Sequence, residues 1–505
     1  MGAHAKSRRS RDISEDDIRR LVFPGFRFGK DDPAYAERLT DLGAGGFCVY
    51  GGGVQEIAAL TRRLQRRARV PLLFCADYED GLPTMAEGGT ALPSNMGIGA
   101  AASETLAYRK GRITGIEARA IGVRWVFAPV VDLATRAENP IVNIRAFGAK
   151  PSLVSRLARA YLRGMRSTGV LSCVKHFPGH GDTRKDSHLE LPTVAAGRPL
   201  LVSRDLAPYR ATLPLADSVM LAHLHVPALG TPRGLPASLS GAVVGRLLRE
   251  RMGYRGLVVT DALDMRAVAG RFPEAKAALM ALEAGADVIL VPARPESLLR
   301  ALPGLVEDGG LEAKARAAAE RLTRAKRLCG LFRDRGLTPA GDIERVESAS
   351  HRRAAEKMAA AATAWARRGA GAVPLRGEVA YLEPRTGSSG GPQGSALLDE
   401  LKTLGITAVP LGRARRADRV LVATFVGPRA YSGRIRLTPA ERRKANAALG
   451  RSPRSVAASF GSPFVLDELR GFHAGLCAFS ASEPAQRAAA RVLAGKTRAT
   501  GRMPV

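Results

Sequence analysis

The chain has 505 residues, which is enough for two or three domains of ordinary size. Apolar residues make up 46% and charged residues 25%, a composition typical of a globular protein with a sizeable core. The 77 Lys and Arg residues exceed the 47 Asp and Glu residues, so the formal net charge is +30. This excess suggests a polyanionic partner, but aromatic residues are only 5% and the basic residues are scattered along the chain. We therefore expect a solvated basic surface and no specific nucleic-acid partner.

The sequence also argues against a membrane-spanning protein and against a disulfide-stabilised one. No uninterrupted apolar run reaches the ~18–20 residues that a membrane span needs. Residues 1–20 are basic and lack the apolar stretch of a secretory signal. The five cysteines are odd in number and widely spaced, which predicts buried thiols and neither a disulfide framework nor a zinc knuckle. These features predict a soluble cytoplasmic protein without a membrane partner, and they leave its oligomeric state open.

The first 340 residues alternate short apolar runs with longer Ala-, Arg- and Leu-rich segments of helical character. Alternation of this kind, with continuously apolar strands, predicts a parallel sheet that is covered on both faces. Seven or eight such units fit a (β/α)8 barrel, although the eighth strand is not located. No GxGxxG follows a strand, which disfavours a dinucleotide-binding sheet. The predicted strands are Gly45–Tyr50, Pro71–Ala76, Trp125–Asp132, Val170–Lys175, Ser218–His223, Gly256–Asp261 and Asp287–Pro292.

A second, smaller α/β domain is expected after the barrel. Two charged, Ala-rich helices are predicted first, at Leu311–Leu331 and Ser350–Arg368. We therefore divide the chain into a barrel of residues 1–345, a helical linker of residues 346–372 and an α/β sandwich domain of residues 373–505. Predicted strands in the last part are Glu378–Leu382, Arg419–Val426 and Ser455–Phe460.

Three of the eight histidines fall in one window, KHFPGHGDTRKDSH at residues 175–188. The window starts at the end of a predicted barrel strand, where barrel enzymes carry their chemistry, and its Pro and Gly residues predict a loop. Within it, Asp186 and His188 are two residues apart. A carboxylate bonded to one ring nitrogen fixes the tautomer and stabilises the protonated ring. The pair therefore predicts a general acid and base that works near neutral pH.

A second segment, RGLVVTDALDM at residues 255–265, leads an apolar strand directly into Asp261. A carboxylate at this place faces the barrel mouth, where it can attack an electrophilic carbon or stabilise a cation. The alternative role is capping of the following helix, for which Asp264 is better placed than Asp261.

These two windows resemble glycoside hydrolase family 3, specifically its β-N-acetylhexosaminidase branch. Further similar stretches are AENPIVNIRAFG at residues 137–148, LPASLS at 235–240 and EAGADVILVP at 283–292. The resemblance covers roughly residues 20–330, and the segment ASFGSPFVL…CAFSASEPAQRAAA resembles the second domain of some members. It implies Asp261 as the nucleophile and His188 as an unusual acid/base residue held by Asp186.

The resemblance also implies a set of sugar-binding residues. The Lys-His pair that contacts substrate corresponds to Lys175 and His176, and the sugar-binding Arg to Arg145. Asp77 corresponds to the Asp that holds sugar hydroxyls in the family's DxEGG pattern. Here Asp80 replaces the first Gly of that pattern, which puts the fine shape of the pocket in question.

By resemblance, the reaction is retaining, exo-acting hydrolysis of a short β-linked N-acetylglucosamine glycan, such as a peptidoglycan fragment, without cofactor or metal. A β-glucosidase of the same family stays open as an alternative. A glycoside phosphorylase also stays open, because a neutral base does not repel a phosphate acceptor. β-Glucosidase members take their acid/base carboxylate from the second domain, and the intact DSH sequence argues against that arrangement.

Two alternatives come from other classes. A metal-dependent barrel hydrolase could use His223 and His225 with His176, His180, Asp182 and His188 as ligands. A polyanion-binding protein would be supported only by the charge of +30, and its binding would depend steeply on salt.

Overall fold

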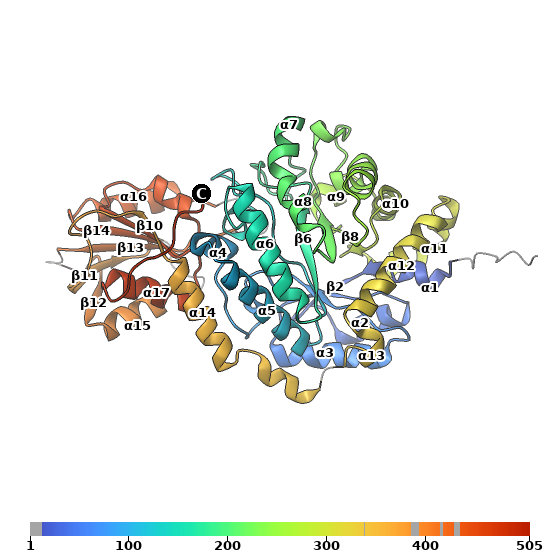
Figure 1. The fold of residues 1–505 in the computed structure, drawn as a ribbon, viewed down its shortest axis with the longest axis horizontal. Coiled ribbons are helices and arrows are strands. Elements are labelled where there is room, and N and C mark those ends of the chain that lie inside the picture. The colour runs from blue at the N-terminus through green and yellow to red at the C-terminus, as the bar shows by residue number, and fades with distance from the viewer. Residues whose placement is uncertain (1–12, 338, 385–392, 415–417, 429–434) are drawn as a thin grey trace, which may run out of the picture.

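The computed structural model describes residues 13–337, 339–384, 393–414, 418–428 and 435–505, so the basic residues 1–12 lie outside it. Residues 13–334 form the expected barrel, and a second domain lies beside it (Figure 1). In the described part of the chain, no helix is long and apolar enough to cross a membrane. All five cysteines are buried free thiols.

The barrel sheet is parallel throughout, and its strands follow the order of the sequence. Its members are β2 (Gly25–Arg27), β3 (Cys48–Tyr50), β4 (Cys75–Ala76), β5 (Trp125–Val126), β6 (Leu171–Phe177), β7 (Ser218–Leu221) and β8 (Leu257–Thr260). Closure comes from β1 (Val22–Phe23), which runs into β2 and pairs with β9 (Ile289–Leu290), while Val288 bridges to Val259 of β8.

The eighth strand, which the sequence did not locate, is the segment β1–β2. Pro24 lies between the two short pieces, and proline has no backbone N–H to give to a sheet. The interruption leaves runs of only two and three residues, too short to show a strand pattern. The barrel prediction itself is confirmed.

Helices surround the sheet, as expected for strands that are apolar on both faces. Helix α5, one of the two longest of those described, begins after Ser103, whose hydroxyl accepts a hydrogen bond from Leu106 N. The helices before α5 are α1 (Glu15–Arg19), α2 (Pro33–Asp41), α3 (Val54–Arg67) and α4 (Asn95–Ala101). Those that follow are α5 (Glu104–Ala120), α6 (Pro151–Arg166), α7 (Arg198–Leu200), α8 (Ala207–Thr212), an unlabelled helix Ala242–Arg251, α9 (Arg266–Ala269), α10 (Glu274–Ala284), α11 (Pro295–Asp308), α12 (Glu312–Leu328) and α13 (Leu331–Asp334).

The second domain is a six-stranded sheet with the order β10-β15-β14-β13-β11-β12. All neighbours are parallel except β10 and β15. The strands are β10 (Ala364–Arg367), β11 (Gly377–Leu382), β12 (Ile406–Pro410), β13 (Val420–Thr424), β14 (Ser455–Ser459) and β15 (Ala474–Cys477). The helices are α15 (Ser395–Thr403), α16 (Pro439–Leu449) and α17 (Glu483–Leu493).

The segment between the domains differs from the expectation in one respect. Helix α14 (Ala349–Ala362) ends earlier than the predicted helix Ser350–Arg368, because Ala364–Arg367 pairs with β15 instead. Tertiary pairing here overrides the helix propensity of an Ala- and Arg-rich segment. The edge strand β10 therefore falls inside the proposed linker of residues 346–372, and we assign it to the second sheet. Helix α14 packs against α4 of the barrel and α17 of the second domain (Figure 1).

Helices α5 and α6 pack closely because each has a glycine that lies against the backbone of the other helix. A Cβ on Gly164 would lie 2.0 Å from Tyr108 O, and one on Gly111 would lie 2.2 Å from Tyr161 O. No side chain fits at such distances, so this part of the barrel wall needs glycine at both positions.

We expect Gly164→Ala to lower the free energy of unfolding by about 1–3 kcal/mol, because the new methyl group overpacks the contact with Tyr108. Urea denaturation would measure this effect. Gly304→Ala in the middle of α11 is the matched control, since nothing lies within 4 Å of a Cβ there. That change should stabilise the protein by up to about 1 kcal/mol through helix propensity alone. Equal stabilisation by both substitutions would contradict the packing argument.

Candidate active site

A pocket opens at the carboxyl ends of the barrel strands. Its wall includes Ile144 of the barrel and Pro428 of the second domain. Six of the seven residues expected from the sequence line this pocket: Asp77, Arg145, Lys175, His176, His188 and Asp261. Residues from several strand ends and loops converge here because the carboxyl ends of parallel strands meet at one end of a barrel.

The seventh residue, Asp186, lies behind His188. Its Oδ1 atom lies 2.7 Å from His188 Nδ1 and accepts a hydrogen bond of 2.8 Å from His188 N. The carboxylate of Asp186 is fully buried, whereas the imidazole of His188 is 22% exposed and faces the pocket. An ionised carboxylate only accepts hydrogen bonds, so Nδ1 carries the proton and Nε2 is the nitrogen that can exchange one with a substrate.

Asp261 follows directly after β8 and is fixed through its backbone. Its N–H donates to Leu221 O at 3.0 Å, and its Oδ1 accepts from Ala262 N at 2.9 Å. Burial alone would raise the pKa of this carboxyl, but nearby His176, His223 and His188 and the Ala262 N–H outweigh it and lower the pKa. The group is therefore an anion at neutral pH, as a nucleophile requires.

A buried network of charges lies beside Asp261. Lys175 Nζ donates to Asp77 Oδ1 and to Glu79 Oε1, each at 2.6 Å. The Arg145 guanidinium donates two hydrogen bonds to the Glu79 carboxylate, of 2.9 and 2.7 Å. Burial would raise the pKa of Glu79, but Arg145 and Lys175 hold it well below the usual range. These groups offer charged donors and acceptors to sugar hydroxyls from fixed positions.

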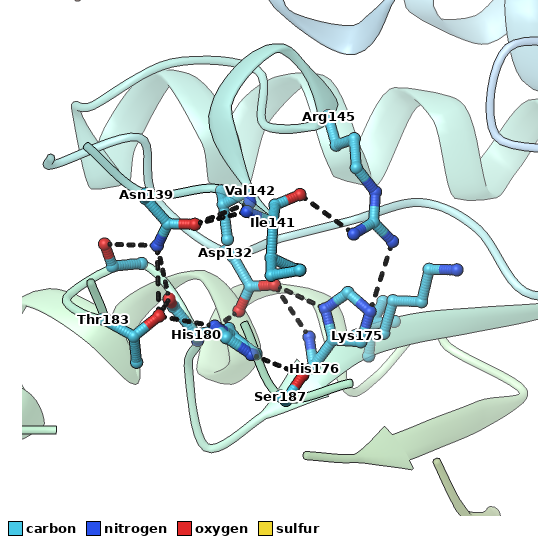
Figure 2. Close-up of polar contacts among 12 residues, drawn as sticks. Asp132, Asn139, Ile141, Val142, Arg145, Lys175, His176, His180, Thr183 and Ser187 are labelled. Carbon is cyan, nitrogen blue, oxygen red and sulfur yellow. Dashed lines mark hydrogen bonds and ion pairs between the residues drawn. The ribbon is translucent and has the colours of Figure 1, made fainter. Parts of the chain in front are cut away.

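His176 is oriented by Asp132, as Figure 2 shows. Asp132 Oδ2 lies 2.7 Å from His176 Nδ1, and Arg145 Nη2 lies 3.4 Å from His176 Nε2. Since arginine can only donate, Nε2 accepts and Nδ1 carries the proton. Burial would raise the pKa of Asp132, but His176 and His180 lower it.

The loop that carries the Asp186–His188 pair is hydrogen-bonded to Asp132, the residue that orients His176 (Figure 2). His180 N donates to Asp132 Oδ1 at 2.7 Å, and the ring of His180 contacts Thr183 Oγ1 at 2.8 Å and Ser187 Oγ at 3.2 Å. Burial lowers the pKa of His180 to about 4, so its ring is neutral at physiological pH. Asn139 Nδ2 donates to the carbonyl of His180 at 2.9 Å.

Asp80, which replaces a glycine of the family pattern, also lines the pocket. Its Oδ1 accepts from the fully buried Lys110 Nζ at 2.8 Å, and Lys110 donates to Asn95 Oδ1 at the same distance. Burial raises the pKa of Asp80 and lowers that of Lys110, although each partner opposes the shift of the other. The replacement thus comes with a buried cation that pairs with it.

Asp264 does not cap the following helix. Residue Met265 precedes α9 and makes no side-chain cap, whereas Asp264 Oδ2 accepts from Arg27 at 2.9 Å across the pocket. Position along the chain favoured a cap, but Arg27, at the end of the unlocated strand, provides a stronger partner. Burial raises the pKa of Asp264, and Arg27 opposes that rise.

The candidate metal ligands are dispersed. His223 is buried and contacts Ser238 and Ala262, while His225 contacts Thr193. Among the residues that the structure describes, no group of three or more His, Cys, Asp or Glu side chains is arranged to hold a metal ion.

Three side chains that organise the site, Glu79, Asp132 and Asn139, were not identified from the sequence. Each stands at a position in the sequence that weakly indicates a role in the site. Glu79 stands two residues after Asp77, Asp132 ends a predicted strand, and Asn139 precedes a proline in the stretch that carries Arg145. Residue type and position alone do not distinguish them from ordinary loop carboxylates and amides.

Comparison with known proteins agrees with this arrangement. Residues 15–325 match the family described as Glycosyl hydrolase family 3 N terminal domain. The chain is 37% identical over 260 residues to a beta-hexosaminidase of Alkalilimnicola ehrlichii, covering 49% of this chain and 74% of that protein. It is 33% identical over 284 residues to Beta-hexosaminidase A of Pseudoalteromonas piscicida, covering 52% of this chain and about half (48%) of that relative.

Among solved structures, a glycoside hydrolase family 3 β-N-acetylglucosaminidase from Paenibacillus sp. str. FPU-7 is 30% identical, with a TM-score of 0.86. The alignment covers 97% of this chain and 98% of that chain, so it includes both domains. A barrel with this site and these relatives defines a glycoside hydrolase. The chain belongs to glycoside hydrolase family 3.

We expect Asp132→Ala to lower the free energy of unfolding by about 3–5 kcal/mol at pH 7, because it leaves buried hydrogen-bond donors of His176 and His180 without their acceptor. Urea denaturation would measure the difference from the wild-type protein. Glu307→Ala, an exposed carboxylate on α11, is the control and should change it by less than about 0.5 kcal/mol.

The effect of Asp132 should also depend on pH. Because the folded state lowers the pKa of this group, its stabilisation is complete above the unfolded pKa of about 3.9 and is lost as the pH falls below that value. The gap between wild type and Asp132→Ala should therefore be constant from pH 7 to pH 5 and shrink towards pH 3. A gap that widens in acid would contradict this assignment.

Proposed function

We propose that the protein is a retaining, exo-acting β-N-acetylhexosaminidase with Asp261 as nucleophile and His188, held by Asp186, as general acid and base. One observation carries the proposal: the His188–Asp186 pair and the ionised Asp261 meet at the same pocket, and His188 is close enough to lower the pKa of Asp261. Most retaining glycosidases use a second carboxyl group in the role proposed here for His188.

The first step forms a covalent glycosyl-enzyme. Asp261 bonds to the anomeric carbon as the bond from that carbon to the leaving oxygen breaks, and His188 Nε2 gives its proton to that oxygen. In the second step His188 takes a proton from water, the water oxygen bonds to the anomeric carbon, and the Asp261 carboxylate leaves. Two inversions at one carbon retain the β configuration.

The substrate class follows from the relatives and the pocket. The two curated relatives described above are named beta-hexosaminidases, and the Paenibacillus structure is a β-N-acetylglucosaminidase. Lys175 and His176 are buried, so a sugar that reaches them lies at the inner end of the pocket, which suits the terminal residue of a glycan. We propose Asp77, Arg145, Lys175 and His176 as the residues that bind it.

Short glycans such as peptidoglycan fragments are the proposed natural substrates. Five free buried thiols favour a reducing compartment, and we propose the cytoplasm as the site of action. We also keep the division into barrel, linker and second domain as a proposal, with β10 placed in the second domain.

The decisive assay compares nitrophenyl β-N-acetylglucosaminide with nitrophenyl β-glucoside, each with and without phosphate and with and without a chelator. We expect preference for the N-acetylated substrate, no stimulation by phosphate and full activity after chelation, because proton transfer is assigned to His188. Release of a sugar phosphate would identify a phosphorylase. Loss of activity that zinc restores would identify a metal-dependent hydrolase.

The His188–Asp186 pair can be tested through the leaving group. A nitrophenolate departs readily without a proton, whereas a sugar alkoxide needs one. We therefore expect His188→Ala and Asp186→Ala to slow cleavage of a disaccharide by about 10²–10⁴-fold and to slow formation of the glycosyl-enzyme from the nitrophenyl glycoside much less. Stopped-flow release of nitrophenolate and disaccharide kinetics would measure the two losses.

Azide provides a rescue for the same variants. It attacks the glycosyl-enzyme without needing a base, so the second step should recover and a β-glycosyl azide should accumulate. Asp261→Ala is the control, because it forms no glycosyl-enzyme through which azide could yield the β product. Equal losses on both substrates without rescue would show that His188 has a different role.

A further inference from the structure

His223 is a buried histidine that the proposed mechanism does not use. It lies two residues after β7 and is fully shielded from solvent. The metal-dependent alternative of the sequence analysis paired it with His225 as a ligand, but its two ring nitrogens have other partners. Nδ1 lies 2.7 Å from Ser238 Oγ, and Nε2 lies 3.0 Å from Ala262 O.

The direction of these hydrogen bonds follows from the chemistry of the partners. A carbonyl oxygen only accepts, so Nε2 carries a proton and donates to Ala262 O. Burial lowers the pKa of His223, although Asp261 and the adjacent backbone groups oppose the shift, so the ring is neutral at physiological pH. Nδ1 then accepts from the hydroxyl of Ser238.

Ala262, which accepts a hydrogen bond from His223, also donates one to the proposed nucleophile Asp261. Ala262 N donates to Asp261 Oδ1 at 2.9 Å, while Ala262 O accepts from His223. A movement of Ala262 would therefore turn its N–H away from the carboxylate. The Asp261 backbone N–H is fixed separately by Leu221 O, so the Ala262 contact is what orients the side chain.

Ser238 is itself held in place by the local backbone structure. It lies in the LPASLS stretch, in a short helical turn Ala237–Leu239, where Ala237 N donates to Leu224 O at 2.7 Å. Ser238 is fully buried. The chain Ser238–His223–Ala262–Asp261 thus links the loop after β7 to the carboxylate after β8.

We propose that His223 is a positioning residue for the nucleophile: through Ala262 it sets the orientation of the Asp261 carboxylate towards the anomeric carbon. This inference rests on the proposed function, since it concerns the same carboxylate. A carboxylate that rotates out of line loses rate while the sugar-binding groups keep their affinity, because displacement by about 1 Å can cost about 10²-fold.

The test compares His223→Gln with His223→Leu. Glutamine can place its amide N–H near the position of Nε2 and donate to Ala262 O, whereas leucine fills similar space without a donor. We expect His223→Leu to reduce the rate of the nitrophenolate burst from nitrophenyl β-N-acetylglucosaminide by about 10²-fold. The dissociation constant of that substrate, taken from the concentration dependence of the burst rate, should stay within about threefold of wild type. His223→Gln should recover most of that loss.

Further variants separate positioning from stability. Ser238→Ala removes the donor to Nδ1 and should lower the same rate by a smaller factor at an unchanged substrate dissociation constant. Its effect should not add to that of His223→Leu, because both act through one contact chain. His225→Ala, two residues along and without contact to Ala262, is the matched control and should keep wild-type kinetics. Circular dichroism and thermal unfolding would monitor the fold of each variant.

The outcomes are distinct. A burst that is present in wild type and absent in Asp261→Ala establishes the proposed function independently of His223. With that burst in hand, the positioning role is overturned if His223→Leu keeps its rate, if glutamine and leucine are equally impaired, or if the loss appears in the substrate dissociation constant. Full additivity of His223→Leu and Ser238→Ala would overturn it as well. If His223→Leu unfolds, Ser238→Ala serves as the criterion, and an unchanged burst rate in that variant overturns the role.

Discussion

The requirement that buried charges be paired governs the mouth of this barrel. Lys175 and Glu79 are almost fully shielded from water, and an isolated charge in such a place would cost several kcal/mol. Lys175 therefore contacts Asp77 and Glu79, and Arg145 closes the network with two hydrogen bonds to Glu79. Because each group supports the ionised state of the next, the side chains proposed to bind the sugar are held in place before a substrate arrives. Preorganisation of this kind lowers the cost of binding and of charge development in the transition state.

Asp132 applies the same principle to the histidine loop. It accepts hydrogen bonds from the His176 ring, from the His176 and His180 backbone and from Tyr209. One carboxylate thus anchors His176, which lines the pocket, and the base of the loop that carries the Asp186–His188 pair. The loop lacks regular secondary structure, so these side-chain contacts replace the backbone hydrogen bonds that a helix or strand would supply.

The departure from the family pattern at Asp80 follows the same logic. Asp80 would add an unbalanced carboxylate to the pocket, and Lys110 balances it from α5. Asp264 is balanced in the same way by Arg27 at the end of β2. The large positive net charge, by contrast, has no counterpart at the site, where carboxylates and cations are closely matched. The excess of arginine is thus a property of the chain as a whole and does not define the pocket.

Regular patterns of the sequence were sufficient for the architecture. Continuously apolar runs separated by helical segments indicate a parallel barrel, because only buried strands on both faces require such runs. The strand β1–β2 escaped detection since Pro24 divides it, and β10 escaped because its residues favour a helix until β15 pairs with them. Strands β12 and β15 of the second sheet were not predicted either.

For the site, the sequence by itself determined the residues whose chemistry is written in a local motif: Asp186 and His188 within one loop, and Asp261 at the end of one strand. Only the tertiary structure decided which distant groups support them. Glu79 with Arg145, Asp132 with His176, Asp80 with Lys110 and His223 with Ala262 are each separated by at least thirty residues. Closure of the barrel brings these partners within hydrogen-bond distance, and no periodicity or spacing along the chain encodes a contact of that kind.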